Sequence, residues 1–474
     1  MEKDVIRIVK RNGYIEDFKP EKIREAVITS AERVMVSLTD EALDEIISIV
    51  RKLLKTQTTN PTIDQVHSCV EAALEQVNPL VAKSYREYRD YKKDIVHILD
   101  KVYKKAQVIT YIGDKECANM DSALVTTQRC LIYNSLNKEL YKKFFLTTNE
   151  IEACKDGYIY IHDMSARRDT MNCCLFDMAN VLKDGFEMSN IWYTEPKTLQ
   201  TAFNVMGDVI INTTAMQYGG FTVPEVDTVL KKYAKLTYKK YYDEYLDIKG
   251  DTFKDEADKY AWSKVKRECE QGYQGIEYKL NTVSSSRGDY PFVTFSFGID
   301  TDEFAKLITR VMLDVHREGQ GKKGFKRPTL FPKLVFLYDQ KLHGKGGELR
   351  DNFLAAIKCS QKTMYPDYLS LSGEGYVCDI YKKYGRVVSP MGCRAFLSPW
   401  YEKGGMNPLD KNDKPVYIGR FNIGAVSLHL PMILAKAREE QKDFYEVLDY
   451  YLEMIRRIHI RTYRYLAKRK ASTN

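Results

Sequence analysis

The chain has 474 residues, of which 44% are hydrophobic and 29% charged, and its 73 Lys and Arg against 65 Asp and Glu give a formal net charge of +8. This composition excludes a collagen-like, disordered or low-complexity chain, and the length suits two or three globular domains. The small charge excess is compatible with phosphate-bearing ligands and does not indicate a nucleic-acid partner.

The thiols and the absence of long apolar runs indicate the compartment. No run of about 18 apolar residues occurs, and the first residues have no apolar signal core. The ten cysteines include no Cys-x-x-Cys pair. We therefore expect a cytoplasmic protein with reduced thiols, without disulfides and without a membrane partner.

Residues 1–95 are predicted to form a mainly helical domain with a small β-hairpin cap. A short apolar strand leads into Asn12-Gly13, a strong hairpin signal, and the chain then returns as a second strand. Apolar residues at helical spacing predict the helices that follow. These cover residues 22–36, 42–54, a helix from Thr62 with a capping box to Gln65, and a helix from Pro79 to about residue 105.

Residues 96–474 are predicted to form an α/β domain, because helical patterns alternate with short apolar runs. The predicted helices cover residues 149–156, 224–245, 254–280, 302–317, 348–362 and 431–470, and the predicted strands cover residues 159–161, 292–297, 333–337 and 425–428. The segment 365–424 is rich in Gly, Pro, Ser and Asn. It is long for a mere connection, and such segments in compact domains commonly carry function.

A basic hairpin tip is the first candidate binding site. Lys10 and Arg11 stand beside the tight Asn12-Gly13 turn, where two cations and a close backbone suit a polyphosphate. A basic hairpin tip is more often simply solvated. The run GQGKKGFK at 319–326 lacks the spacing of a phosphate-binding Walker A loop.

Three cysteines and one asparagine are the candidates for chemistry. Cys173 and Cys174 are adjacent, so on a strand one thiol can face a cavity while the other packs into the core. Cys393 follows Gly392 inside the long irregular segment, and a loop thiol with close backbone approach suits a reactive group. Asn422 could hold a hydroxyl or a small acid. Each of these residues taken alone is more often a buried thiol or a turn residue.

The amino-terminal string resembles a known regulatory module. The run VIRIVKRNGYIEDFKPEKIREAV, with AKSYREYRDYKK at the end of the region, is similar to the ATP-cone, the nucleotide-sensing module of ribonucleotide reductases. The resemblance implies that Lys10 and Arg11 contact the phosphates of ATP or dATP. It also implies that ATP permits turnover and dATP suppresses it.

The rest of the chain resembles the anaerobic (class III) ribonucleotide reductases. The runs NCCLFDM, QYGG, MYPD, SPMGCR and GR-x-N-x-G follow the order and character of that family of glycyl-radical enzymes, which reduce ribonucleoside triphosphates. The resemblance implies an incomplete ten-stranded α/β barrel in which Cys393 becomes the thiyl radical and Cys173 hands a hydrogen atom to the substrate radical. It also implies that Asn422 positions substrate and formate, and Met391 indicates the subtype that takes electrons from formate.

The resemblance also implies partners. They are deoxynucleoside triphosphate effectors, a second copy in a homodimer, and a separate activating enzyme with an iron–sulfur cluster and S-adenosylmethionine. Enzymes of the family carry a four-cysteine zinc site and a C-terminal glycyl-radical loop, whereas here no Cys-x-x-Cys occurs and no Gly follows Gly424. We therefore expect a C-terminally truncated chain without metal ligands that is inactive alone, and a C-terminal glycyl-radical fragment is a candidate partner.

Two alternative functions compete with that of an active reductase. The chain could be a nucleotide-binding regulatory or split-enzyme subunit without catalysis of its own. It could instead be a glycyl-radical enzyme of the formate-lyase kind. The ATP-cone resemblance argues against the latter, and so does the single Cys393, because that kind places two adjacent cysteines on the corresponding loop.

Overall fold

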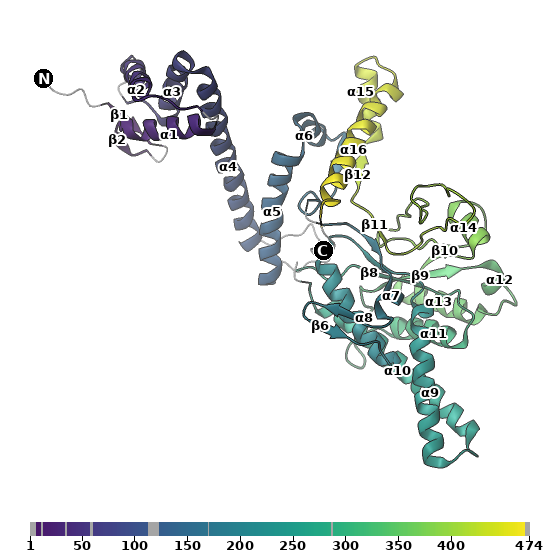
Figure 1. Ribbon diagram of the computed structural model, residues 1–474. Helices are drawn as coiled ribbons and strands as arrows, with labels where there is room; N and C mark the ends of the chain where they lie inside the picture. Colours follow the sequence, from purple (N-terminus) through teal and green to yellow (C-terminus); the bar gives the residue numbers. More distant parts are fainter. Residues whose placement is uncertain are drawn as a thin grey trace. The chain divides into compact units, whose positions relative to one another are not determined.

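The chain forms two compact units, Met1–Lys104 and Lys105–Asn474, which are described separately (Figure 1). The computed structural model describes residues 6–10, 13–33, 36–56, 60–111, 123–168, 170–285 and 288–469. No helix in this described part of the chain is long and apolar enough to cross a membrane.

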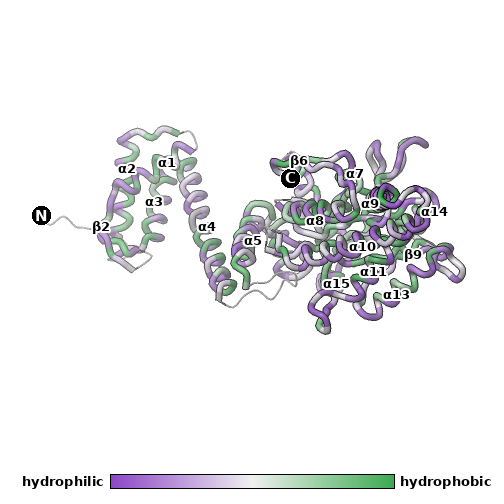
Figure 2. Tube along the Cα trace, turned by 90° about the horizontal axis from the view of Figure 1, so that it is seen from below, coloured by the Kyte–Doolittle hydropathy of each residue, from purple (hydrophilic) through white to green (hydrophobic). Residues whose placement is uncertain are grey.

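The first unit is a helical bundle with a hairpin. Its elements are β1 (Arg7–Val9), β2 (Ile15–Asp17), α1 (Pro20–Arg33), α2 (Asp40–Lys55), α3 (Ile63–Val77) and α4 (Pro79–Tyr111). Thr62 and Gln65 form the predicted capping box at the start of α3. The apolar faces of the helices meet in one core, and Figure 2 shows apolar and polar residues alternating along α1–α4. The predicted hairpin and helices are confirmed, although α4 extends past the expected end near residue 105.

The second unit is built on a mostly parallel sheet. In the described residues this sheet has six strands in the order β10-β9-β8-β7-β4-β11. The strands are β4 (Cys174–Leu175), β7 (Phe221–Val223), β8 (Val293–Phe297), β9 (Lys333–Tyr338), β10 (Asp367–Ser370) and β11 (Arg420–Phe421). All are parallel except β11, which is antiparallel to β4. The predicted mixed α/β class is confirmed, and the ten-stranded barrel stays a prediction.

The two faces of the sheet are covered differently. One face packs against helices in the main apolar core, to which Phe295 and Phe336 contribute. These helices are α8 (Leu199–Ala215), α9 (Val226–Lys249), α10 (Lys254–Thr282), α11 (Glu303–Glu318) and α13 (Arg350–Thr363). The other face carries Thr294, Ser296 and Val335, and it is covered by α14 (Tyr376–Tyr384) and the irregular residues that follow α14. Alternate residues of each strand thus serve different layers.

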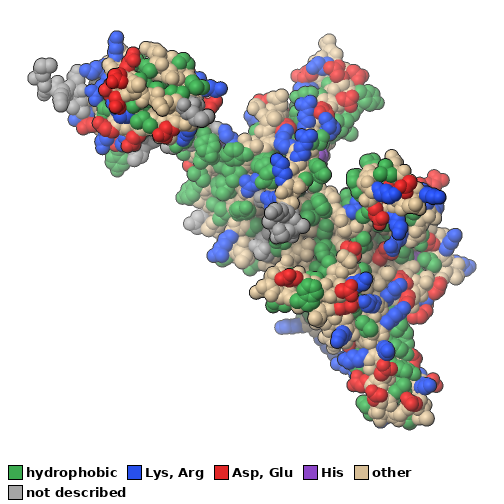
Figure 3. Space-filling model, viewed as in Figure 1, with side chains coloured by type: hydrophobic (Ala, Val, Ile, Leu, Met, Phe, Trp, Pro, Cys, Tyr) green, Lys and Arg blue, Asp and Glu red, His purple; other side chains and the backbone are tan. Residues whose placement is uncertain are grey.

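The remaining elements form a satellite core and short connections. β3 (Ile159–Ile161) pairs with β12 (Val426–Leu428) beside α5 (Val125–Phe145), α6 (Thr148–Lys155), α15 (Leu430–Glu439) and α16 (Phe444–Leu466). The short elements are α7 (Met178–Leu182), β5 (Phe186–Met188), β6 (Ile191–Tyr193) and α12 (Gln340–His343). On the face drawn in Figure 3, basic and acidic side chains are interspersed over the second unit, as the small net charge suggests.

Two sequence expectations need correction. The single helix expected over residues 431–470 is two helices, because Gln441 adopts a positive φ of 54° and Asp443 caps a new helix, accepting from the backbone N–H groups of Tyr445 and Glu446. The segment 365–424, expected to be irregular, contains the short elements β10, α14 and β11. The predicted helix over residues 149–156 is confirmed as α6, which begins with a capping box between Thr147 and Glu150.

Candidate active site

A cavity of about 420 Å³ lies at the amino edge of the parallel strands. Cys173 directly precedes β4, Gly220 precedes β7 and Phe292 precedes β8, and all three line the cavity. Asn422 follows β11, which runs the other way, so Asn422 arrives at the same edge. Cys393 completes the wall from the irregular segment.

The adjacent cysteines point to different environments, as the alternation along a strand predicts. Cys174 belongs to the main apolar core, and burial raises the pKa of its thiol to about 12. Cys173 lines the cavity and is 4% exposed. Its sulfur accepts a hydrogen bond from the Gly220 N–H at 3.1 Å, and its S–H lies 3.5 Å from Asn172 Oδ1. Cys173 is therefore held on the cavity side by its neighbours.

Cys393 stands on a tight turn that is anchored to the sheet. The Arg394 N–H donates to the Met391 carbonyl at 2.7 Å, and the Met391 N–H donates to the Ala395 carbonyl at 2.9 Å. The Arg394 side chain donates through Nε to Asp367 Oδ2 at 2.7 Å, and Asp367 begins β10. The MYPD run thus serves to fasten the turn that presents Cys393.

Close backbone contact between two glycines seats this turn on the sheet. A Cβ on Gly392 would lie 2.9 Å from the Gly220 Cα and 2.9 Å from the Phe292 ring. A Cβ on Gly219 would lie 2.6 Å from Cys173 Sγ. Any side chain at these positions would force the turn and the strand edge apart, which explains the glycines in the QYGG and SPMGCR runs.

The two cavity thiols interact with each other. The hydrogen bond with the Cys173 thiol lowers the pKa of Cys393 to about 6, an effect that outweighs desolvation. The same contact, together with burial, raises the pKa of Cys173. The exposed Cys393 thus loses its proton first, and the buried Cys173 keeps its hydrogen. The pair combines an accessible sulfur with a protected hydrogen donor.

Asn422 connects the wall to the packing behind it. Its Oδ1 accepts from the Cys173 N–H at 3.4 Å and the Gly424 N–H at 3.2 Å, and its Nδ2 donates to the Met391 sulfur at 3.2 Å. Met391 is fully buried and does not line the cavity. Met391 is therefore placed behind Asn422, where it fixes the orientation of the amide.

Three further residues of the cavity wall were not among the predicted site residues. His162 lines the cavity and its Nε2 contacts Ser427 Oγ at 2.8 Å. Tyr218 donates to the Ile423 carbonyl at 3.3 Å, and its place in the QYGG run was the available signal. Asp289 also lines the cavity, and no motif marked it.

The hairpin tip of the first unit is described only in part. Lys10 Nζ lies 2.6 Å from Glu16 Oε1, and Lys22 Nζ lies 3.2 Å from the same atom. These two lysines, Lys10 first, hold the pKa of Glu16 below its ordinary value. Arg11 lies outside the described residues.

Two protein-family models match this chain. The family model of anaerobic ribonucleoside-triphosphate reductase matches residues 116–473, and the model of the ATP cone domain matches residues 6–94. The chain belongs to the anaerobic ribonucleoside-triphosphate reductase family. The reductase-family chain thus combines the two modules in the order that the sequence indicates.

Curated relatives carry the same family name. The anaerobic ribonucleoside-triphosphate reductase of Escherichia coli K12 is 31% identical over 464 residues, which are 95% of this chain and 61% of the relative. That of Enterobacteria phage T4 is 34% identical over 321 residues, which are 67% of this chain and 50% of the relative. The chain therefore spans about three fifths of the length of the bacterial relatives it matches.

Solved structures support the fold. The anaerobic ribonucleotide reductase from Thermotoga maritima with dATP bound in the specificity site matches with a TM-score of 0.52 at 13% identity, covering 80% of this chain and 63% of that one. The same enzyme with glycerol in the active site matches with a TM-score of 0.53.

Proposed function

We propose that this chain contributes the substrate-side thiols for the anaerobic reduction of ribonucleoside triphosphates to 2′-deoxyribonucleoside triphosphates. The observation that carries the proposal is that Cys393, on an anchored turn, and Cys173, directly before β4, line the same cavity. Replacing a ribose 2′-hydroxyl by hydrogen requires removal of a hydrogen atom from the neighbouring carbon, and a thiyl radical is a side-chain species able to do this.

In this proposal the two thiols have separate tasks. The Cys393 thiyl takes the hydrogen atom from C3′ and becomes a thiol, and the 2′-hydroxyl takes up a proton and leaves as water. The Cys173 S–H, which burial and the Gly220 contact keep in place, gives its hydrogen atom to the substrate radical and becomes a thiyl that formate reduces. The Cys393 S–H finally returns its hydrogen atom to C3′, which restores the Cys393 thiyl. A glycyl radical, expected of the family, would supply the first hydrogen-atom acceptor, and the exposed position of Cys393 leaves its sulfur open to such an acceptor.

Formate is the reductant that we propose. Formate and one proton supply two electrons and two hydrogens, so that ribonucleotide, formate and a proton give deoxyribonucleotide, carbon dioxide and water. Asn422 faces this cavity beside Cys173 and would orient formate and substrate. In the described part of the chain no group of three or more His, Cys, Asp and Glu could hold a metal ion, and no step is assigned to zinc.

Regulation and partners form the other part of the proposal. The first unit would bind ATP or dATP through Lys10 and Arg11, and Lys10 would exchange its ion pair with Glu16 for a phosphate. Deoxynucleoside triphosphate effectors, a homodimer, an activating enzyme with an iron–sulfur cluster and a C-terminal glycyl-radical fragment would complete the system.

Substrate protection tests the proposal on this chain. CTP should slow alkylation of Cys393 by iodoacetamide, measured by peptide mass spectrometry, and should not slow alkylation of Cys130, which does not line the cavity. Absence of protection at saturating CTP would contradict the assignment of the cavity.

Reduction itself distinguishes an enzyme from a regulatory subunit. The chain is mixed under anoxic conditions with the C-terminal part of a relative, activating enzyme, S-adenosylmethionine, formate, ATP and CTP, and dCTP is measured. Cys393→Ala should abolish dCTP formation, whereas Cys174→Ala, which alters the core thiol, should retain it. Equal dCTP from both variants would refute the role of Cys393, and ATP binding with no dCTP from the unaltered chain would favour a purely regulatory subunit.

A further inference from the structure

A fully buried arginine lies directly behind the wall of the thiol cavity. Arg167 stands on the connection between β3 and β4 and is 0% exposed. Its Nη1 donates to the carbonyl of Ala425 at 3.0 Å, and Ala425 lines the cavity. Its Nε and Nη2 are buried and have no hydrogen-bond partner among the described residues. Arg167 therefore brings to this wall a positive charge that no described carboxylate pairs with.

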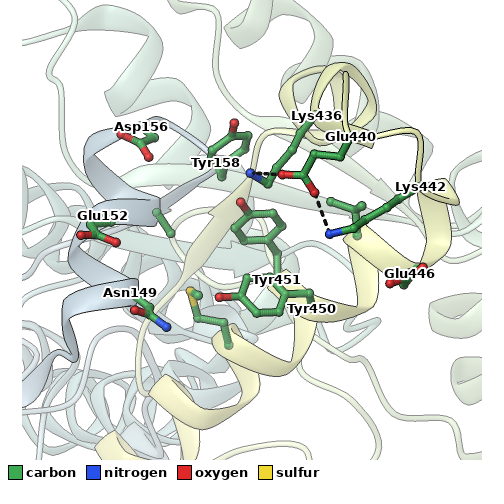
Figure 4. Close-up of a pocket in the computed structure, with 13 residues that line it drawn as sticks. Asn149, Glu152, Asp156, Tyr158, Lys436, Glu440, Lys442, Glu446, Tyr450 and Tyr451 are labelled. Atoms are coloured by element: carbon green, nitrogen blue, oxygen red, sulfur yellow. Dashed lines mark hydrogen bonds and ion pairs between the residues drawn. The ribbon is translucent and has the colours of Figure 1, made fainter. Parts of the chain in front are cut away.

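Lysines of the same unit show the usual arrangement of a cation beside a cavity. In the separate cavity of Figure 4, Lys436 and Lys442 lie 2.8 and 2.9 Å from the carboxylate oxygens of Glu440. Burying a charge without such a partner costs free energy that a neutral side chain of similar size avoids. Stability therefore does not explain Arg167, which indicates a role at the adjacent thiol cavity.

Arg167 and Tyr218 hold the segment that follows Asn422. The carbonyl before Gly424 accepts from the Tyr218 hydroxyl at 3.3 Å, and the carbonyl after Gly424 accepts from Arg167 Nη1. A Cβ on Gly424 would lie 2.8 Å from the Tyr218 oxygen and 2.9 Å from Arg167 Cζ, so this backbone packs closely on both side chains. The Gly424 N–H in turn donates to Asn422 Oδ1 at 3.2 Å. The guanidinium thus helps to set the orientation of the Asn422 amide.

The charge of Arg167 also reaches neighbouring groups. Burial raises the pKa of Tyr218, and the Arg167 charge opposes this rise. Burial, followed by the same charge, lowers the pKa of His459 on α16. The described lining of the thiol cavity contains the carboxylates of Asp163 and Asp289 and neither lysine nor arginine. An anion in this cavity would therefore depend on a cation behind the wall.

Two other cations lie near the wall. Arg394 is paired through Nε, at 2.7 Å, with the carboxylate that begins β10. The Lys333 ammonium lies 4.4 Å from the centre of the Phe292 ring, and burial, followed by the Arg394 charge, lowers its pKa. Of these three cations, only Arg167 combines an unpaired charge with a hydrogen bond to the backbone that follows Asn422.

We propose that Arg167 is a positioning residue for formate in the thiol cavity. Formate is an anion at neutral pH, as other carboxylates are, and the Arg167 charge draws it to the side of the cavity where Asn422 lies. The hold of Arg167 on the Gly424 segment keeps the Asn422 amide turned toward the same place. This inference rests on the proposed function, in which formate is the reductant.

Titration of the full chain with isotopically labelled formate, followed by NMR line broadening at constant ionic strength, tests the inference. Arg167→Met should weaken formate binding by about tenfold or more through loss of the charge. Arg167→Lys, measured at about pH 6, keeps a positive charge and should stay within about threefold of the unaltered chain. Arg168→Met removes the next guanidinium along the chain, which bonds Asn137 and does not line the cavity, and should leave the affinity unchanged.

Two further measurements separate this role from a structural one. Arg167→Met should be at least as stable to urea as the unaltered chain, because it removes an unpaired buried charge. Tyr218→Phe leaves Arg167 unaltered and should weaken formate binding by about threefold, because it frees one carbonyl beside Gly424.

Four results would overturn the inference. They are equal formate affinity in Arg167→Met and the unaltered chain, an equal loss in Arg168→Met, displacement of formate by equimolar chloride, and unchanged affinity in Tyr218→Phe. The failure of this inference is distinct from the failure of the proposed function. A chain that binds no formate while CTP still protects Cys393 would refute the role of Arg167 and leave the assignment of the cavity intact.

Discussion

Removing the Cys173 thiol should raise the pKa of Cys393. The hydrogen bond with Cys173 is the leading cause of the low value of about 6 in Cys393, and desolvation acts in the opposite direction. In Cys173→Ala the remaining backbone contacts still favour the thiolate, while desolvation opposes it. The pKa of Cys393 should therefore move toward its ordinary value of 9.0.

The size of the change follows from the exposure of Cys393. Because this thiol is exposed, solvent screens part of the interaction, and we expect the titration midpoint to rise by at least about one pH unit. At pH 7 the thiolate fraction is about nine tenths for a pKa of 6, about one half for 7 and about one hundredth for 9. A more basic thiolate is also a better nucleophile, by roughly threefold per pH unit, which offsets part of the loss in rate.

The assay must therefore report the midpoint and not one rate. Cys393 alkylation by iodoacetamide is followed from pH 5 to about pH 10 by mass spectrometry of its peptide, in the unaltered chain and in Cys173→Ala. Cys174→Ala is the matched control, because this thiol packs in the apolar core and not in the cavity. Circular dichroism confirms that the variants fold.

An unchanged midpoint in Cys173→Ala would show that the thiols do not share a hydrogen bond. A midpoint near 9 in the unaltered chain would lead to the same conclusion. A similar shift in Cys174→Ala would show that the effect comes from general loosening of the strand and not from contact between the cavity thiols.

Three further substitutions, each measured by urea unfolding, test the packing of the second unit. Gly392→Ala should lower the free energy of unfolding by about 1–3 kcal/mol, because its Cβ would lie 2.9 Å from a facing backbone carbon. The control Gly275→Ala, whose Cβ would meet no atom within 4 Å, should stabilise its helix by about 0.5–1 kcal/mol. Equal effects of the two substitutions would contradict the close packing of the turn on the sheet. Burial first, then Asp227, raises the pKa of Glu225 to about 7, so the folded chain binds a proton more tightly and its stability falls as pH rises from about 4.5 to 7. Glu225→Gln should remove that fall and be more stable than the unaltered chain at pH 8 by about 1–3 kcal/mol, and a variant equally sensitive to pH would refute this. Arg461→Met should cost about 3 kcal/mol at pH 7, because it leaves the buried carboxylate of Glu150 in α6 without its ion pair, and the loss should shrink at acid pH as that carboxylate is protonated.

The candidate site could be predicted from the sequence because its residues lie in short motifs with unusual chemistry. The adjacent Cys173 and Cys174, and the glycine before Cys393, could be interpreted without a structure, and so could the strongly periodic helices. The two- and three-residue strands β4, β7 and β11 were too short to give a pattern. The pairing of Arg394 with Asp367 depends on how distant segments meet, which no local signal records. The role of Met391 behind Asn422 was likewise visible only in three dimensions.

Strand β8 sets the length of the loop that carries Cys393, residues 389–394, which we call the arch. Ser389 Oγ bonds Ser296 Oγ at 2.9 Å, and Arg394 Nη1 lies 3.4 Å from Thr294 Oγ1, so both ends of the arch are fixed at neighbouring positions on one face of the strand. Deleting one residue between these two anchors would shorten the arch by up to about 3.5 Å. We expect such a deletion to separate the sulfurs of Cys173 and Cys393. The spacing of Thr294 and Ser296 on β8 therefore sets the number of residues between Ser389 and Arg394.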